Sequence, residues 1–381
     1  MRIGDPIDPR IPWVRAIHDL DDARATTVAG SRLRDYRRVG RVLGDSLRAA
    51  PTAVAVKTLP LTTLLYPTAF AFNHAVPLPF PYVQMNHRCL LVQLEVEGET
   101  KNLLFNPTDY VASERTPFFA DLVNALPAPT LTKKLLTTQQ GQVDVQLRRL
   151  GLSPADIDLI AFDHFHTQDL RPLLGSSEGG WSARFPNALL LAPRREWDDW
   201  DALHPLQRQW FVPDGKRGVP MDRVVLFDAD LRLGPSSLLL RTPGHTSGNQ
   251  TLFVHGARGV FGCSENGCSA DSWSPGASRI PGVRRLARKY GYEVVLNSNT
   301  PELAAEQYNS MVLERSVVDP SEIDPAFVQM FPSSEVTPSA LAPGIRPSMR
   351  YGHRDHGAIR RARPKAGPSA RAEVEAAGPA S

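Results

Sequence analysis

Two histidines separated by one residue form the most informative chemical motif of this chain. They lie in the stretch Asp163-His164-Phe165-His166-Thr167-Gln168-Asp169, which follows the apolar run 157–162. The apolar run predicts a strand, and the two-residue period of a strand would place both imidazoles on the same side. Imidazole is a common protein ligand of zinc and iron. The pair therefore predicts a metal centre, provided that a third ligand comes from elsewhere in the chain.

A second candidate ligand, His245, lies in a short loop between two predicted strands. The segment 238–241 leads into Thr242-Pro243-Gly244-His245-Thr246, and 251–254 is predicted as the next strand. Neighbouring Pro and Gly residues are typical of a rigid turn, which can hold a ligand in a fixed place. Three imidazoles with one open position form a known catalytic zinc arrangement, in which bound water has a pKa near ~7.

Strands and helices alternate along most of the chain, and this order favours an α/β layered domain. Apolar runs predict strands at 53–59, 89–96, 101–105, 188–192, 224–227, 238–241, 251–254 and 294–297. Helices are predicted within 117–152 and at 195–200 and 284–290, and a surface helix at 32–43 is weakened by Gly40. Residues 97–99 between two of the strands predict a β-hairpin turn.

These motifs, in this order, resemble the metallo-β-lactamase-fold superfamily over about residues 53–315. The family places H-x-H-x-D-H after a strand and a Pro-Gly-His-Thr loop later in the chain. The lead-in "LGLSPADIDLIAFDHFH" and the following "FPNALLLAPRREWDDWD" are similar to the family's strand and helix at these places. The resemblance implies a four-layer αββα sandwich with metal bound at one edge of the paired sheets. It also implies that His164, His166 and His245 are metal ligands.

The chain departs from the family at the positions that serve a second metal. Gln168 and Asp169 stand where the family has Asp and His, and Ser264 or Glu265 stands nearest the place of its bridging Asp. The segment 297–299, near the family's last His, contains no histidine. We therefore expect one ion rather than two, with zinc favoured and mononuclear iron as the alternative because two His and a carboxylate also suit iron.

Two carboxylates are candidates for proton transfer at this site. Asp169 could bind the metal or act as a general base, and it could equally serve as a helix N-cap before residues 170–175. Glu265 is the second candidate, in a Ser-Glu-Asn-Gly stretch that also suits a turn. Gln168 could donate a hydrogen bond to substrate. His87 could line the mouth of a pocket, although an ordinary loop histidine explains it as well.

Composition indicates a soluble, cytoplasmic protein with no basic nucleic-acid platform in its body. The net charge is +3, of which residues 335–381 carry +4, so the rest is about −1.

The three cysteines, Cys89, Cys263 and Cys268, do not form a disulfide framework. Cys263 and Cys268 could bind metal or form a redox pair, but small buried residues are the simpler explanation. No membrane segment is predicted, because the most hydrophobic window, 59–72, is too short to span a bilayer.

Three regions are expected along the chain: a polar and helical extension at 1–52, the metallo-β-lactamase-like domain at 53–332, and a disordered basic tail at 333–381. The favoured function is a metal-dependent hydrolase in which metal-bound hydroxide attacks a small ester, lactone, thioester or amide. One alternative is a non-catalytic binding protein of the same fold with a vestigial site, and another is an iron enzyme. The oligomeric state has no signal in the sequence.

Overall fold

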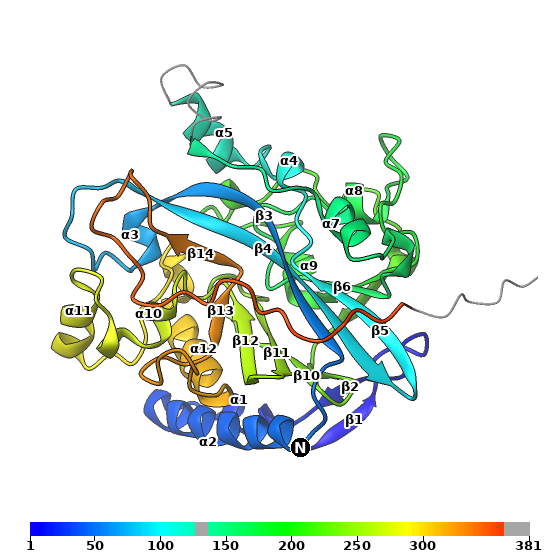
Figure 1. The fold of residues 1–381 in the computed structure, drawn as a ribbon, viewed down its shortest axis with the longest axis horizontal. Helices are drawn as coiled ribbons and strands as arrows, with labels where there is room; N and C mark the ends of the chain where they lie inside the picture. Colours follow the sequence, from blue (N-terminus) through cyan, green and yellow to red (C-terminus); the bar gives the residue numbers. More distant parts are fainter. Residues whose placement is uncertain (126–135, 362–381) are drawn as a thin grey trace, which may run out of the picture.

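The computed structural model describes residues 1–125 and 136–361. Two large β-sheets pack face to face, and helices cover the outer face of each (Figure 1). The helical layer of the first sheet is formed mainly by α2 and α12, and that of the second sheet includes α7 and α9.

The first sheet is mostly antiparallel and has the order β1-β2-β9-β10-β11-β12-β13. Its strands are β1 (Ile3–Pro6), β2 (Val14–Ile17), β9 (Asp230–Leu233), β10 (Ser237–Arg241), β11 (Gln250–Gly256), β12 (Gly259–Ser264) and β13 (Met330–Pro332).

The second sheet has the order β14-β4-β5-β6-β7-β8, and β3 also pairs with the long strand β4. Its strands are β3 (Ala55–Pro67), β4 (Tyr82–Val96), β5 (Glu99–Phe105), β6 (Leu159–Ala161), β7 (Leu189–Pro193), β8 (Val224–Phe227) and β14 (Ser334–Thr337). Strands β5 to β8 run parallel, so their carboxyl ends meet at one edge of the sheet.

Among the described helices, α2 and α12 are long and the others are short. They are α1 (Asp21–Ala25), α2 (Ala29–Arg48), α3 (Thr68–Ala71), α4 (Tyr110–Ser113), α5 (Pro117–Asn124), α7 (Val143–Arg149), α8 (Arg171–Leu174), α9 (Arg194–Asp199), α10 (Ala270–Trp273), α11 (Val283–Tyr290) and α12 (Ala304–Val317). Single 3-10 turns span Pro154–Asp156, Arg208–Trp210, Met221–Arg223, Pro275–Ala277 and Pro301–Leu303. None of the helices in the described ranges is long and apolar enough to cross a membrane.

Three separate hydrophobic cores show that the molecule has four layers. Leu90 of β4 faces the first sheet and joins a core with Leu239 and Leu252. Leu91, one residue further along β4, belongs to the core beneath the outer helices. Leu238 of β10 packs against α2 and α12 in the third core. Because strand residues alternate between faces, each sheet supplies two cores, and the expected αββα sandwich is confirmed.

The N-terminal segment 1–52 is part of the sandwich, not an appendage to it. Strand β2 pairs with β9 and extends the first sheet. Helix α2 packs closely on α12, since a Cβ at Gly40 would lie 2.7 Å from Ser316 Cβ and one at Gly44 would lie 2.3 Å from a backbone oxygen of Val317. Gly40 therefore permits close helix packing and does not end the helix.

The expected disordered tail at 333–381 is corrected for its described part, 333–361. Strand β14 pairs with β4, and Glu335 forms a buried ion pair with Arg88 (2.9 Å). Further along, Arg354 lies over the ring of Phe261. The Pro- and Ser-rich composition suggested disorder, but partners distant in the sequence bind this segment to the body. Residues 362–381 lie outside the described part of the chain.

Candidate metal centre

The candidate site forms where the carboxyl ends of strands from both sheets meet. In the second sheet, Asp163 and the histidine pair follow β6, and Glu196 follows β7 within α9. In the first sheet, His245 follows β10 and Glu265 follows β12. Strands β10 and β12 both run antiparallel to β11 between them, so their ends lie at the same edge. The sandwich thus brings four segments to one place.

The histidine pair lies in a loop, because β6 ends at Ala161. Strand alternation therefore does not set the two ring directions, contrary to the sequence interpretation. The loop turns sharply after His166, where Thr167 adopts a left-handed backbone with φ of 63°. Such a conformation is costly for a β-branched residue and is maintained by its surroundings. Here the N–H of Thr167 donates to the carbonyl of Trp210 (2.7 Å).

Three histidines converge as the sequence predicts. Within the described ranges, the group of His, Cys, Asp and Glu side chains close enough to share an ion consists of His164, His166 and His245, with ligand atoms within 4.8 Å of one another. Nδ1 of His166 lies 3.2 Å from Nε2 of His245. A tetrahedral zinc site with bonds of about 2.0–2.1 Å separates its ligand atoms by roughly 3.3 Å, so this pair fits such a site.

Hydrogen bonds select which ring nitrogen of His164 and of His166 is available. Nδ1 of His164 lies 2.7 Å from Oδ1 of Asp163, which leaves Nε2 as its ligand atom. Nε2 of His166 donates to the amide oxygen of Gln207 (2.6 Å), which leaves Nδ1. Nδ1 of His245 lies 3.3 Å from the side-chain nitrogen of Asn297. Partners of this kind fix the tautomer and orientation of metal-binding imidazoles.

Electrostatics keep two of these rings neutral. Burial and the neighbouring His164 hold the pKa values of His166 and His245 well below the ordinary value of 6.5. Neutral imidazole is the form that binds a metal ion. The donor set, its burial and its hydrogen-bond support therefore fit zinc or a similar divalent ion.

Glu196 joins the two ligand-bearing loops. Its side chain is 2% exposed, and its two oxygens accept the backbone N–H groups of Phe165 (2.8 Å) and Gly248 (3.1 Å). Phe165 stands between the paired histidines, and Gly248 follows His245 by three residues. One buried carboxyl group therefore sets the spacing of the two loops.

A second carboxyl group, Glu265, lines the pocket and shares a hydroxyl with Asp163. The Ser333 hydroxyl contacts both carboxyl groups, at 2.6 Å from Glu265 Oε2. A hydroxyl has one hydrogen to donate, so both contacts are satisfied only when one carboxyl group carries a proton. Burial and the charge of Asp163 raise the pKa of Glu265 to about 7, which makes Glu265 the holder of that proton.

The structure does not bring Asp169 into the histidine group. Its fully buried carboxylate forms ion pairs with Arg115 and with Arg171 (2.8 Å). Its Oδ1 also accepts the backbone N–H of Arg171, the first residue of α8 (3.1 Å). These contacts use its oxygens to hold the start of α8 and two arginines. The N-cap of α8 is Leu170, so the sequence alternative that made Asp169 the N-cap is wrong by one position.

His87 and Gln168 lie in the pocket wall. The two ring nitrogens of His87 contact the hydroxyls of Ser334 and Thr108, both at 2.9 Å, and burial lowers its pKa to about 4. His87 is therefore a neutral hydrogen-bonding group. Gln168 donates to the carbonyl of His166 (3.2 Å).

The three cysteines are free and buried. Burial raises the pKa of Cys263 and that of Cys268 well above the ordinary thiol value, so both remain thiols. Neither belongs to the histidine group, and small buried residues describe them adequately.

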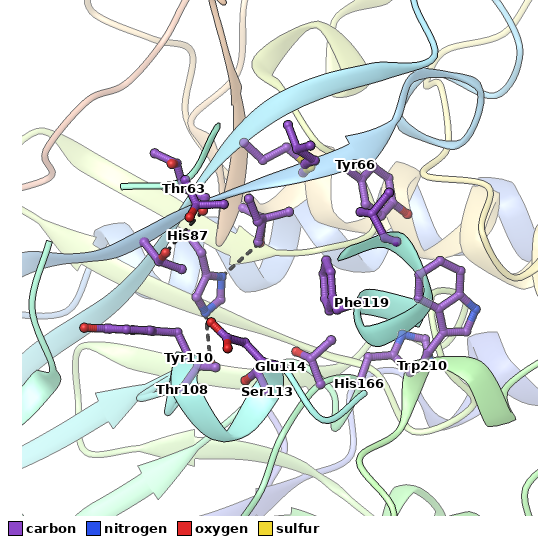
Figure 2. Close-up of a pocket in the computed structure, with 18 of the residues that line it drawn as sticks. Thr63, Tyr66, His87, Thr108, Tyr110, Ser113, Glu114, Phe119, His166 and Trp210 are labelled. Carbon is purple, nitrogen blue, oxygen red and sulfur yellow. Dashed lines mark hydrogen bonds between the residues drawn. The ribbon is translucent and has the colours of Figure 1, made fainter. Parts of the chain in front are cut away.

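The histidines line one pocket of ≈ 260 Å³. Figure 2 shows Tyr66, Phe119 and Trp210 on the side of His166, and His87 with Thr108 and Glu114 on the other. The pocket-lining residues include Glu114, Asp163 and Glu265 but, within the described ranges, no lysine or arginine. Apolar walls come from β3, β4, α5 and the 3-10 turn Arg208–Trp210, through Leu64, Leu65, Tyr66, Met85, Phe119, Leu122, Val123 and Trp210.

Five supporting residues were missed by the sequence interpretation. Asp163 directly precedes His164, and Asn297 lies in the segment where the family has its last His, so the positions of both were usable signals. Glu196, Gln207 and Ser333 gave no local signal, because each acts on a loop that is distant in the sequence.

No protein-family model and no curated protein matches the chain. Solved structures are similar to it at low sequence identity. A probable metal-dependent hydrolase from Staphylococcus aureus has 14% identity over 57% of this chain and 74% of its own, with a TM-score of 0.43. An N-acyl homoserine lactone hydrolase, solved with N-hexanoyl-L-homoserine at its catalytic metal centre, has 16% identity over 64% and 91%, with a TM-score of 0.41. A hydrolase of the beta lactamase superfamily, AbOPH, has 16% identity over 63% and 85%, with a TM-score of 0.39.

Proposed function

We propose that this chain is a metal-dependent hydrolase that acts on a small, uncharged ester or lactone with an apolar substituent. The observation that carries the proposal is the convergence of three buried histidines at a pocket of ≈ 260 Å³. Their free ring nitrogens form a donor set suited to zinc. One ion is favoured over two, because Gln168 and the ion-paired Asp169 occupy positions that would serve a second ion.

A divalent ion bound by the three imidazoles would polarise a substrate carbonyl and make water a better nucleophile. The residues of the chain provide the rest. Asp163 orients His164, and Gln207 orients His166. Glu265 lines the same pocket, and its carboxyl group can accept a proton from water and return it to the leaving oxygen.

The charges and the apolar side chains of the pocket wall favour an uncharged substrate. Every charged side chain that is described in its lining is acidic, so a phosphate or carboxylate on the substrate would find no cationic partner there apart from the metal ion itself. Burying an unpaired anion is costly. The aromatic and aliphatic side chains of β3, β4 and α5 offer contact for an alkyl or aryl group.

Metal analysis joined to a matched substrate pair tests the proposal. Protein purified without added metal, and again after zinc loading, should contain about one ion per chain. The p-nitrophenyl ester of hexanoic acid should be hydrolysed with a kcat/KM at least about tenfold above that of the adipic acid monoester, which has the same length and a terminal carboxylate. His245→Ala should lose both metal and activity.

His18→Ala is the matched control, since His18 is an exposed histidine outside the pocket, and it should retain metal and activity. If the chain binds no metal under any loading condition, the proposal of a metal-dependent hydrolase is wrong. Full metal content with no turnover of esters or lactones would instead favour a non-catalytic binding protein.

A further inference from the structure

Seven exposed cationic side chains gather on and beside α11. We call this surface the α11 patch, and its members are Arg279, Arg284, Arg285, Arg288, Lys289, Arg346 and Arg350. Four of them lie on the eight-residue helix α11, whose Val283 and Ala287 face the core. Five of them belong to residues 1–334, and the net charge of about −1 over that range conceals this local concentration.

The patch joins two segments that are distant in the sequence. The backbone N–H of Arg279 donates to the Ser348 hydroxyl (2.6 Å), and the Arg279 side chain donates to the Ser348 carbonyl (2.5 Å). Ser348 lies midway between Arg346 and Arg350. Figure 1 shows α11 at the periphery of the molecule, with the segment that follows β14 beside it.

Counter-charges are missing from both segments. Residues 272–292 contain five Arg or Lys and no Asp or Glu, and residues 338–352 contain two Arg and no Asp or Glu. No ion pair involving a member of the patch is found within the described ranges. Glu293, the first acidic residue after α11, already pairs with Arg37 of α2. A concentration of one charge sign without partners produces a strong local field that attracts polyanions.

Two exposed aromatic rings border these cations. Tyr290 and Tyr292 are 54% and 39% exposed, and their rings stack at 5.4 Å with an interplanar angle of 26°. The ammonium of Lys289 lies 4.9 Å from the centre of the Tyr290 ring. Cations beside exposed aromatic faces are the combination that binds phosphates and stacks unpaired bases.

We infer that the α11 patch binds single-stranded nucleic acid through its phosphates, with Tyr290 or Tyr292 stacking on a base. A lipid surface is less suited, because the apolar side of α11 is buried in the protein and cannot insert. An acidic polypeptide would pair with the cations but would leave the aromatic faces unused. No member of the patch lines the histidine pocket, so this binding is independent of the proposed hydrolysis.

Fluorescence anisotropy with a labelled oligothymidine tests the inference on the full chain. Binding should weaken with salt, because each phosphate contact contributes about 0.7 to the slope of log affinity against log salt. The triple variant Arg284→Gln, Arg288→Gln, Lys289→Gln should reduce that slope by about 2. Tyr290→Ala should lower the affinity at least about fivefold and leave the slope unchanged, since stacking is not ionic.

The matched control is Arg34→Gln, Arg38→Gln, Arg41→Gln on α2, which removes the same charge from another exposed helix face. This control should bind as the unmodified chain does. The inference is overturned if the control loses as much affinity as the α11 variant, or if no binding occurs at low salt. Equally tight binding to polyglutamate or to vesicles of phosphatidylglycerol would also overturn it, because either would show attraction to any polyanion.

Discussion

The Glu196 carboxylate accepts the backbone N–H of Gly248 at 3.1 Å, and this contact ties the loop of His245 to the loop of the histidine pair. The approach is so close that a Cβ at Gly248 would lie 2.4 Å from the Cβ of Glu196. No side chain fits between them. The distance between the two halves of the metal centre thus depends on a glycine and a buried carboxyl group.

Gly248→Ala should separate the two loops and weaken metal binding. The added methyl group clashes with Glu196, and overpacking of this kind costs about 1–3 kcal/mol. We expect zinc affinity to fall at least about tenfold, as when a supporting contact of a metal ligand is lost. Competition with a chromophoric chelator measures the affinity. Gly276→Ala, where an added Cβ meets no atom within 4 Å, should leave affinity and stability unchanged. Equal effects of both substitutions would contradict the role of the Glu196 contact.

Asn297 should be required for tight metal binding through His245. In the structure its side-chain nitrogen faces Nδ1 of His245, and its oxygen accepts the Tyr66 hydroxyl (2.6 Å). Coordination through Nε2 moves the ring hydrogen to Nδ1, and a half-turn of the amide then presents oxygen to it. Asn297→Leu removes both arrangements, so we expect zinc affinity to fall about 10–100-fold.

Isothermal titration with zinc measures this loss. Asn187→Leu is the control, because the side chain of Asn187 donates to the carbonyl of Ala155 in a distant loop. Unchanged zinc affinity in Asn297→Leu would show that His245 needs no such partner.

The three histidines could be predicted from the sequence because each belongs to a short local motif. The reason given for their shared direction was wrong, since β6 ends before His164 and contacts with Asp163 and Gln207 orient the rings. The supporting residues could not be predicted in this way. Glu196 bonds a residue 31 positions away in the sequence, and Ser333 bonds residues 68 or more positions away. No local sequence pattern indicates such contacts.

The fold was predictable in its layers and less so at its ends. Apolar runs predicted most strands of the second sheet, but of the first sheet they predicted only β10 and β11. The apolar segment 294–297 is not a strand, because the N–H groups of Val295 and Asn297 donate to the carbonyls of Ser272 in α10 and of Asn266 in a loop, and not to a neighbouring strand. Segment 333–361 looked disordered by composition, yet the ion pair of Glu335 with Arg88 helps to order it.

Asp169→Asn should reduce stability without reducing metal content. The carboxylate is fully buried between Arg115 and Arg171, and breaking a buried pair costs about 3–5 kcal/mol. The histidine donors remain in place, so the number of bound ions per chain should not change. Urea unfolding and elemental analysis on the same preparation measure both quantities. Asp228→Asn, which breaks an exposed pair with Arg194, should cost at most about 1 kcal/mol. Loss of metal in Asp169→Asn would restore the residue to the list of ligands.

Glu265 should give the metal-free protein a stability that falls as pH rises. Burial and the charge of Asp163 raise the pKa of Glu265 from 4.5 to about 7 in the folded state. The folded chain therefore holds this proton more tightly than the unfolded chain does. Its stabilising contribution is complete below pH 4.5 and is lost as the pH rises toward 7. Each pKa unit corresponds to about 1.4 kcal/mol, so the total change is roughly 3 kcal/mol at most.

Glu265→Gln keeps the size of the side chain and removes the titration. Its stability relative to the unmodified protein should therefore increase between pH 5 and pH 8, as measured by urea unfolding in the presence of a chelator. The control Glu97→Gln changes an exposed carboxyl group in the β4–β5 turn, and its stability difference should stay constant with pH. Parallel pH curves for Glu265→Gln and the unmodified chain would mean that Glu265 does not hold the proton between itself and Asp163. Ser333→Ala would then leave the pH dependence unchanged as well, since no proton would be shared through that hydroxyl.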